Sequence, residues 1–98
     1  MTITKTQNGG DLTVALAGRL DTMTSPQLEK ELQQSMPGAQ TLTMDFTELE
    51  YISSAGLRVL LSAHKAMSAK GGMKVTHIND VVQEVFEVTG FSDILNIE

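Results

Sequence analysis

The 98-residue chain is predicted to be one α/β domain, residues 1–98, with a mixed sheet of four to five strands packed against three or more helices. Three observations predict this class. Several short segments alternate apolar with polar residues, the pattern of strands with one buried face. Three other segments repeat apolar residues every three to four positions, as amphipathic helices do. Because helices that connect strands of one sheet usually form right-handed crossovers, we expect parallel neighbours.

The first half of the chain predicts a hairpin followed by a helix. Alternating residues around Ile3 and over 12–16 flank Asn8-Gly9-Gly10-Asp11, a strong turn signal. Ser25 then has the character of an N-cap followed by a proline at the first helical position. Apolar residues recur at helical spacing as far as residue 36, so this helix is expected to end at Pro37-Gly38.

The second half predicts two more strands and two more helices. Residues 42–46 alternate as a strand that stops near Glu48, and a loop is expected from there to Tyr51. Residues 54–70 form the longest predicted helix, which the pair Gly71-Gly72 ends.

A strand over residues 73–77 comes next, and Asp80 to Gln83 resembles a capping box that opens a third helix ending at Gly90. The tail after Gly90 is apolar enough to dock on the body but too short to assign.

Composition excludes several classes of function. Seven Lys and Arg residues stand against twelve Asp and Glu, a formal net charge of −5, so the chain lacks the basic surface that binds nucleic acid. It has no cysteine, which excludes disulfides, thiol nucleophiles and cysteine-ligated metals. Neither a signal-peptide h-region nor an apolar stretch of about 20 residues is present, so we expect a cytoplasmic protein without membrane contact.

The catalytic motifs also fail, and no enzyme, cofactor or metal site is predicted. A serine-hydrolase elbow needs glycine two positions before its serine, where this chain has Ile52. No phosphate-cradling glycine loop occurs. His64 and His77 lie on separate predicted elements without metal-ligand spacing, and His64 is expected to be a packed, hydrogen-bonded helix residue.

Candidate functional residues gather at the predicted carboxyl ends of the strands, the edge where such sheets place their sites. Asp21 and Asp45 are expected there. They are either a pair of functional carboxylates or formers of turns and caps. Ser53 and Ser54 open the strongest helix, and they either cap it or present a hydroxyl for phosphorylation. A phosphate at that point would meet free N–H groups and the positive end of the helix dipole.

At these residues the chain resembles the STAS domain family, and more closely its bacterial anti-sigma factor antagonists. The resemblance covers nearly the whole chain, up to a final short helix before which this sequence stops. The matching segments follow the family's order and spacing: Gly18-Arg19-Leu20-Asp21-Thr22, Leu42-Thr43-Met44-Asp45-Phe46, Tyr51-Ile52-Ser53-Ser54-Ala55-Gly56-Leu57-Arg58-Val59-Leu60-Leu61, Gly71-Gly72, and Phe86-Glu87-Val88-Thr89-Gly90-Phe91.

The resemblance implies partner switching. In that scheme an unphosphorylated antagonist binds an anti-sigma factor that is also a serine kinase, and the sigma factor is released. The kinase then phosphorylates the antagonist, the complex dissociates, and a serine phosphatase resets it. The family's phosphoacceptor aligns with Ser54, and its preceding Asp is replaced by Ser53, the second candidate acceptor.

The same alignment implies a partner-binding set. Its members are Asp21, Asp45, Ser53, Ala55, Gly56 and Arg58. We expect a monomer until the partner binds. The alternative is a STAS docking module of a stress-sensing or lipid-transport complex that does not use phosphorylation.

Overall fold

The computed structural model describes residues 1–98 and contains one five-stranded sheet in the order β1-β2-β3-β4-β5. β1 and β2 form an antiparallel hairpin, and β3, β4 and β5 continue the sheet in parallel. The strands are β1 (Thr2–Asn8), β2 (Asp11–Leu20), β3 (Thr41–Ile52), β4 (Met73–Thr76) and β5 (Asn96–Ile97). The predicted α/β class and its parallel crossovers are confirmed.

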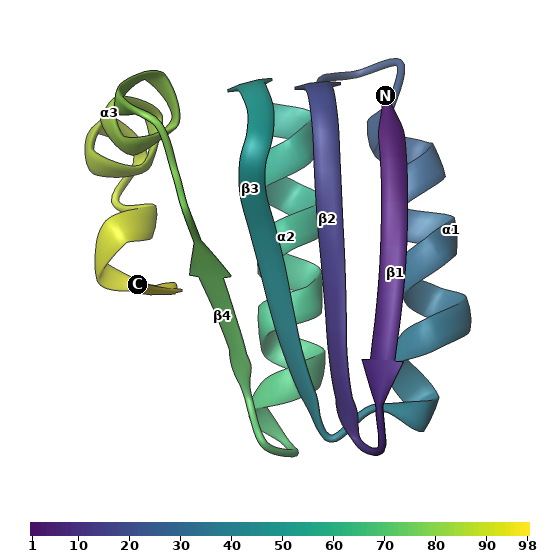
Figure 1. The fold of residues 1–98 in the computed structure, drawn as a ribbon. Coiled ribbons are helices and arrows are strands. Elements are labelled where there is room, and N and C mark those ends of the chain that lie inside the picture. Colours follow the sequence, from purple (N-terminus) through teal and green to yellow (C-terminus); the bar gives the residue numbers. More distant parts are fainter.

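Three α-helices connect these strands. They are α1 (Ser25–Ser35), α2 (Ser54–Ser68) and α3 (Asp80–Thr89), with short 3-10 turns at Met36–Gly38 and Phe91–Asp93. Figure 1 shows α1 and α2 behind the sheet, α3 beside its β4 edge, and the front face of the sheet free of helices. α1, α2 and α3 each fall short of the length and the apolar character of a membrane-spanning helix.

The core lies between the sheet and its three helices, because Val82 and Phe86 of α3 join the side chains contributed by α1 and α2. It comprises 22 buried apolar residues, among which Leu28 of α1, Phe46 of β3 and Leu60 of α2 are 0% exposed. Each such side chain contributes roughly 1.5–3 kcal/mol when fully buried. This layer holds the carboxyl ends of β2 and β3 in a fixed relation to the start of α2.

β3 differs most from the sequence prediction. The predicted stop near Glu48 and loop to Tyr51 are wrong, because β3 runs on to Ile52 and stays paired with β2. The pairing shifts between Ala15 and Ala17 and again between Gly18 and Arg19, so that β3 carries an extra residue at each bulge. Each extra residue moves the following side chains to the other face of the sheet, which breaks the alternation that identifies a strand.

Two predicted helix caps are also wrong. Ser25 is the first residue of α1 rather than its N-cap, and its buried hydroxyl donates to the carbonyl of Asp21 at 2.6 Å. α3 is capped by Asn79, whose Oδ1 accepts from the N–H of Val82 at 2.8 Å, and not by Asp80. At the other end, α3 stops at Gly90 as predicted, and Gly90 has φ 82°, the left-handed conformation that closes many helices.

Candidate functional site

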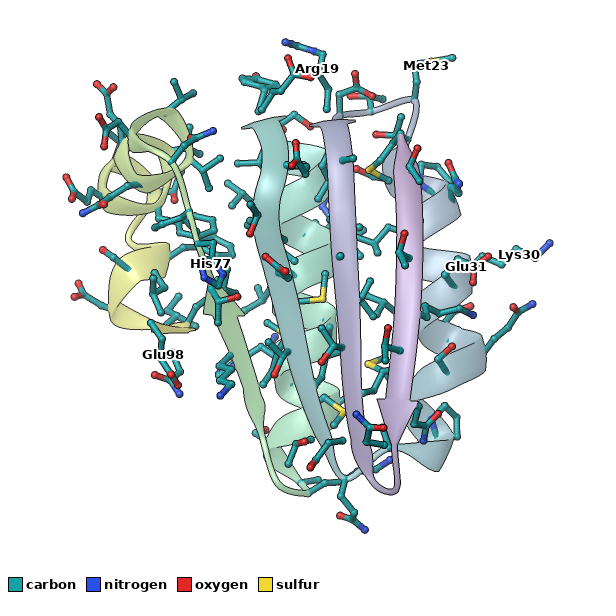
Figure 2. All side chains as sticks on the ribbon, in the orientation of Figure 1. Arg19, Met23, Lys30, Glu31, His77 and Glu98 are labelled. Atoms are coloured by element: carbon teal, nitrogen blue, oxygen red, sulfur yellow. The ribbon has the colours of Figure 1, made fainter.

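The candidate site is the edge at which β2 and β3 end and α1 and α2 begin. The N–H of Ser53 donates to the carbonyl of Leu20 at 2.9 Å, which carries the pairing of the two strands to the first turn of α2. Figure 2 shows the labelled Arg19 and Met23 at this edge, at the top of the view. The structure thus brings the end of β2 next to the start of α2.

Ser54 and Ser53 have opposite environments. Ser54 is exposed at the first position of α2, and its hydroxyl has no hydrogen-bond partner within the chain. Ser53 is the N-cap residue with extended backbone angles, yet its Oγ is buried and unpartnered and caps nothing. The first N–H groups of α2 therefore lack a side-chain cap. Of the two hydroxyls, only that of Ser54 is accessible to another molecule.

Gly56 holds the start of α2 against the strand ends. A Cβ at this position would lie 2.7 Å from Leu20 Cγ and 2.9 Å from Ile52 Cγ1, closer than side chains ever pack. Gly56 is itself buried. Its missing side chain lets the helix, and Ser54 with it, sit close to the sheet. A direct contact of Gly56 with a partner stays a prediction.

Asp21 builds the loop from β2 to α1. Its Oδ1 accepts from the N–H groups of Met23 at 3.0 Å and Thr24 at 3.1 Å, and the Thr24 hydroxyl lies 3.2 Å away. These donors, the Thr24 N–H first, stabilise the carboxylate and lower the pKa of Asp21. Between functional carboxylate and turn former, the contacts favour the turn former, which fixes a loop at the site's edge.

Met23 is a surface feature that the sequence analysis missed. Its side chain is 87% exposed, more than any other large apolar residue of the chain, although the carboxylate of Asp21 holds its backbone N–H. A rigid loop that presents an apolar side chain to solvent is typical of a docking surface. The signal in the sequence was an apolar residue within the turn that follows Asp21.

Arg19 and Tyr51 form a second feature that the sequence analysis missed. They are register partners at the ends of β2 and β3, and the Arg19 guanidinium lies over the Tyr51 ring, 4.4 Å from its centroid. This cation–π contact holds a positive charge at the candidate edge. The predicted loop before Tyr51 had concealed the pairing.

Asp45 lies outside this cluster. It faces the open side of the sheet seven residues before the end of β3, about 20 Å along the strand from the start of α2. The interpretation as a carboxylate pair with Asp21 is therefore wrong. Its Oδ1 accepts from the Thr47 hydroxyl at 2.6 Å and the Thr47 N–H at 3.0 Å, and His77 Nδ1 lies 3.4 Å away. These contacts lower the pKa of Asp45, those with Thr47 most.

The two histidines have unrelated environments. His77 is exposed and adopts φ 60°, an uncommon backbone conformation for a residue other than glycine. His64 is half-buried in α2, and its Nδ1 is buried without a partner. The expectation of a packed, hydrogen-bonded His64 is therefore wrong for the hydrogen bond at Nδ1.

Arg58 and Ala55 line a groove between α1 and α2. Its volume is about 310 Å³, and α1 contributes Pro26, Glu29 and Lys30 to the opposite wall. Arg58 is exposed one turn after Ser54, and Ala55 is half-buried beside it. The structure thus groups Arg58, Ala55 and the accessible hydroxyl of Ser54 on one end of the molecule.

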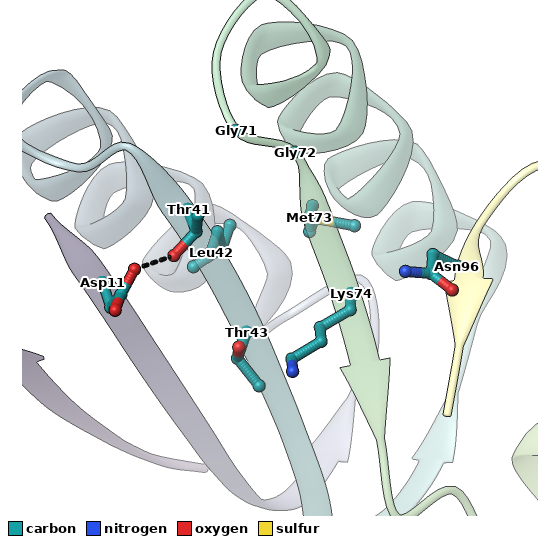
Figure 3. Close-up of a pocket in the computed structure, with 9 residues that line it drawn as sticks. All are labelled: Asp11, Thr41, Leu42, Thr43, Gly71, Gly72, Met73, Lys74 and Asn96. Atoms are coloured by element: carbon teal, nitrogen blue, oxygen red, sulfur yellow. Dashed lines mark hydrogen bonds between the residues drawn. The ribbon is translucent and has the colours of Figure 1, made fainter.

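A further depression, of about 460 Å³, lies at the opposite edge, where β3 and β4 begin (Figure 3). Two of its polar side chains have partners: the Thr41 hydroxyl donates to Asp11 at 2.6 Å within the lining, and Lys74 lies 3.8 Å from Glu98, which is outside the lining. It shares no residue with the edge that carries Ser54, so it is not part of the candidate site.

Comparison with known proteins decides the family, because a family model described as "Mlab, STAS domain" matches residues 3–96. The chain belongs to the STAS domain family. BtrV of Bordetella bronchiseptica, named as a candidate anti-sigma factor antagonist, is 35% identical to this STAS domain over 99 residues, 99% of this chain and 85% of the relative.

One further relative is similar in sequence, and SpoIIAA is similar in fold. The anti-sigma-B factor antagonist of Bacillus subtilis is 28% identical over 92 residues, 93% of this chain and 84% of its own length. The unphosphorylated form of SpoIIAA, an anti-sigma factor antagonist from Bacillus, superposes with a TM-score of 0.85 at 17% identity, covering 99% of this chain and 88% of SpoIIAA. A phosphorylated form of SpoIIAA also has this fold, with a TM-score of 0.76 at 16% identity and coverage of 99% and 91%.

Proposed function

We propose that this STAS domain is an anti-sigma factor antagonist that works by partner switching. The unphosphorylated chain binds an anti-sigma factor that is a serine kinase, and phosphorylation of Ser54 ends the binding. The observation that carries the proposal is the placement of Ser54: an exposed hydroxyl at the uncapped start of α2, on the edge that also presents Met23. The relatives named as anti-sigma factor antagonists support the same role.

The chemistry requires little from this chain beyond a well-placed hydroxyl. Ser54 Oγ attacks the γ-phosphorus of ATP held by the kinase, ADP leaves, and the hydroxyl proton passes to a base of the kinase. Ser54 has no side-chain hydrogen-bond partner within the chain, which supports a base supplied by the kinase and a role for this protein as its substrate. Ser53 is the poorer acceptor, because its Oγ is buried.

The phosphate is compatible with the fold and incompatible with a tight contact. It would add about 1.5 to 2 negative charges at pH 7. At the first turn of α2 these charges meet uncapped N–H groups and the positive end of the helix dipole, so the helix is not disrupted. A partner surface that packs closely on the same edge meets a new charge and a larger group, and it dissociates.

The docking surface we propose is the loop from β2 to α1 together with the first turn of α2. Met23 is its apolar contact, Asp21 fixes the loop, and Ala55 and Arg58 extend it toward the groove. The monomeric chain, a cytoplasmic location and a phosphatase that resets Ser54 belong to the same proposal.

The test is phosphorylation by the serine kinase anti-sigma factor of the same organism, with ATP and measurement of intact mass. One added phosphate is expected for the native chain and for Ser53→Ala, and none for Ser54→Ala. Addition to Ser54→Ala but not to Ser53→Ala would move the acceptor to Ser53. If a kinase that is active on other antagonists modifies none of the three, the switch is refuted.

The second candidate is a STAS docking module without a phosphoswitch, and Ser53 is the observation that favours it. The family's acidic residue is absent from the position before the acceptor, so a charge beside Ser54 is missing. Stable capture of a partner complex that is unaffected by Ser54→Asp would favour this candidate.

A further inference from the structure

Arg58 is the residue through which a phosphate on Ser54 would act on the rest of the edge. The two residues are four positions apart on α2, at its first and fifth positions, and both are exposed. Residues at this spacing have Cβ atoms about 5–6 Å apart on one face of a helix. Side chains of helices also lean toward the N-terminus, so an arginine side chain at position 58 is long enough to reach the turn that holds Ser54.

The guanidinium of Arg58 has no partner in the structure. Four of the seven cationic side chains are engaged, namely Lys5 with Glu31, Arg19 with Tyr51, Lys70 with carbonyls of the 3-10 turn after α1, and Lys74 with Glu98. Lys30, Lys65 and Arg58 make no ion pair or hydrogen bond within the chain. Of these three, Arg58 is the one on the first turns of α2.

The charged residues facing Arg58 come from α1, across the groove. Glu29 lies on that wall but is not within 4.0 Å of Arg58, and its carboxylate accepts from Gln33 at 3.5 Å instead. Lys30 lies on the same wall and adds a second positive charge. No carboxylate is therefore already paired with Arg58, and a phosphate on Ser54 would not have to displace one.

We propose that phosphorylated Ser54 and Arg58 form an ion pair within α2, which withdraws Arg58 from the docking surface. This proposal rests on Ser54 being the acceptor. An acidic group four residues before a basic one is the favourable order on a helix. The planar guanidinium also matches two phosphate oxygens at once, so the pair is stronger than one with lysine.

The pair gives a single modification two effects on a partner. The phosphate adds negative charge to the edge that presents Met23, and the arginine that would contact an acidic group of the partner turns back onto its own helix. The positive charge of Arg58 is then neutralised by the phosphate and no longer available to the partner, in addition to the steric effect of the phosphate.

The test installs phosphoserine at position 54 during translation, so it needs neither kinase nor partner. The titration of the phosphate is followed by ³¹P NMR in the otherwise native chain, in Arg58→Gln, and in Lys65→Gln as the matched control on the same helix. We expect the second phosphate pKa to be about 0.5 lower in the native chain and in Lys65→Gln than in Arg58→Gln, because a nearby cation favours the dianion. This corresponds to about a threefold change in the acid dissociation constant.

Equal phosphate pKa values in the native chain and Arg58→Gln would overturn the pair. So would a rise in Arg19→Gln that is as large as that in Arg58→Gln, since it would show a diffuse effect of charge. Arg58→Lys, which keeps the charge and the helix propensity, is expected to retain part of the shift. The two proposals can fail separately, because phosphoserine is encoded directly. No phosphorylation in the kinase assay would refute the switch but would not change the measured phosphate pKa. Equal phosphate pKa values would refute the ion pair but would not change the outcome of the kinase assay.

Discussion

Gly56→Ala tests whether the position of Ser54 depends on close packing between α2 and the strand ends. The added Cβ would lie within 3.0 Å of three atoms, two of them in Leu20 and one in Ile52. Leu20 is 0% and Ile52 1% exposed, so neither side chain has free space into which it can move. The substitution must shift the helix or the strand ends.

The magnitude follows from two opposing terms. Overpacking a filled core costs about 1–3 kcal/mol, and the buried neighbours place this site toward the upper end. Alanine within a helix gains about 1 kcal/mol over glycine. The net effect is a loss of about 2 kcal/mol of unfolding free energy, which lowers Tm by about 10 °C in a domain of this length.

The assay is urea unfolding followed by circular dichroism, with a thermal melt beside it. Ser62→Ala is the matched control, because Ser62 is exposed on α2 and hydrogen-bonds to nothing, and its effect is expected to stay within about 0.5 kcal/mol. Leu20→Ala combined with Gly56→Ala should show positive coupling of about 1 kcal/mol, because the clash is partly relieved. A Gly56→Ala variant as stable as the native protein would refute the close-packing argument.

Three further predictions follow from the surface, the carboxylates and the caps. Met23→Ala is expected to weaken binding to the anti-sigma partner about tenfold, or about 1.4 kcal/mol by calorimetry, with unchanged Tm. The control is Val88→Ala, because Val88 is 81% exposed on α3, away from the proposed surface, and this variant should bind normally. Equal affinities of the two variants would remove Met23 from the docking surface. The pKa of Asp45 is lowered on folding, so its stabilisation is present above the unfolded value and lost as pH falls through the lower folded value. In urea melts below about pH 4 the native protein should therefore lose stability more steeply than Asp45→Asn, and parallel slopes would contradict this. Asn79→Ala removes the cap of α3 and a hydrogen bond to the Leu49 carbonyl at 2.9 Å, and the free energy of unfolding in the same melts should fall by about 1–2 kcal/mol. Asn79→Asp should recover the cap. A loss below about 0.5 kcal/mol for Asn79→Ala would show that the cap is dispensable.

The candidate site was predictable only in part, and the reason differs between residues. Ser54 could be placed from the sequence, because an exposed helix start follows directly from the local pattern. Met23 could not, because an apolar residue in a turn is buried or exposed according to what packs over it. The environment of Ser53 was equally hidden: its buried Oγ depends on how closely α2 approaches the end of β2, and Gly56 sets that approach.

The fold class, the order of the elements and the three helices could be predicted from the amino-acid sequence, because helical periodicity and strand alternation are local properties of the chain. The end of β3 and the position of Asp45 depend instead on contacts between distant segments. Two bulges against β2 change which face the side chains after Asp45 point to, so a paired strand was predicted as a loop. Hydrogen bonds to β2 hold β3 as a strand across both bulges, and the residue pattern of β3 alone does not show these hydrogen bonds.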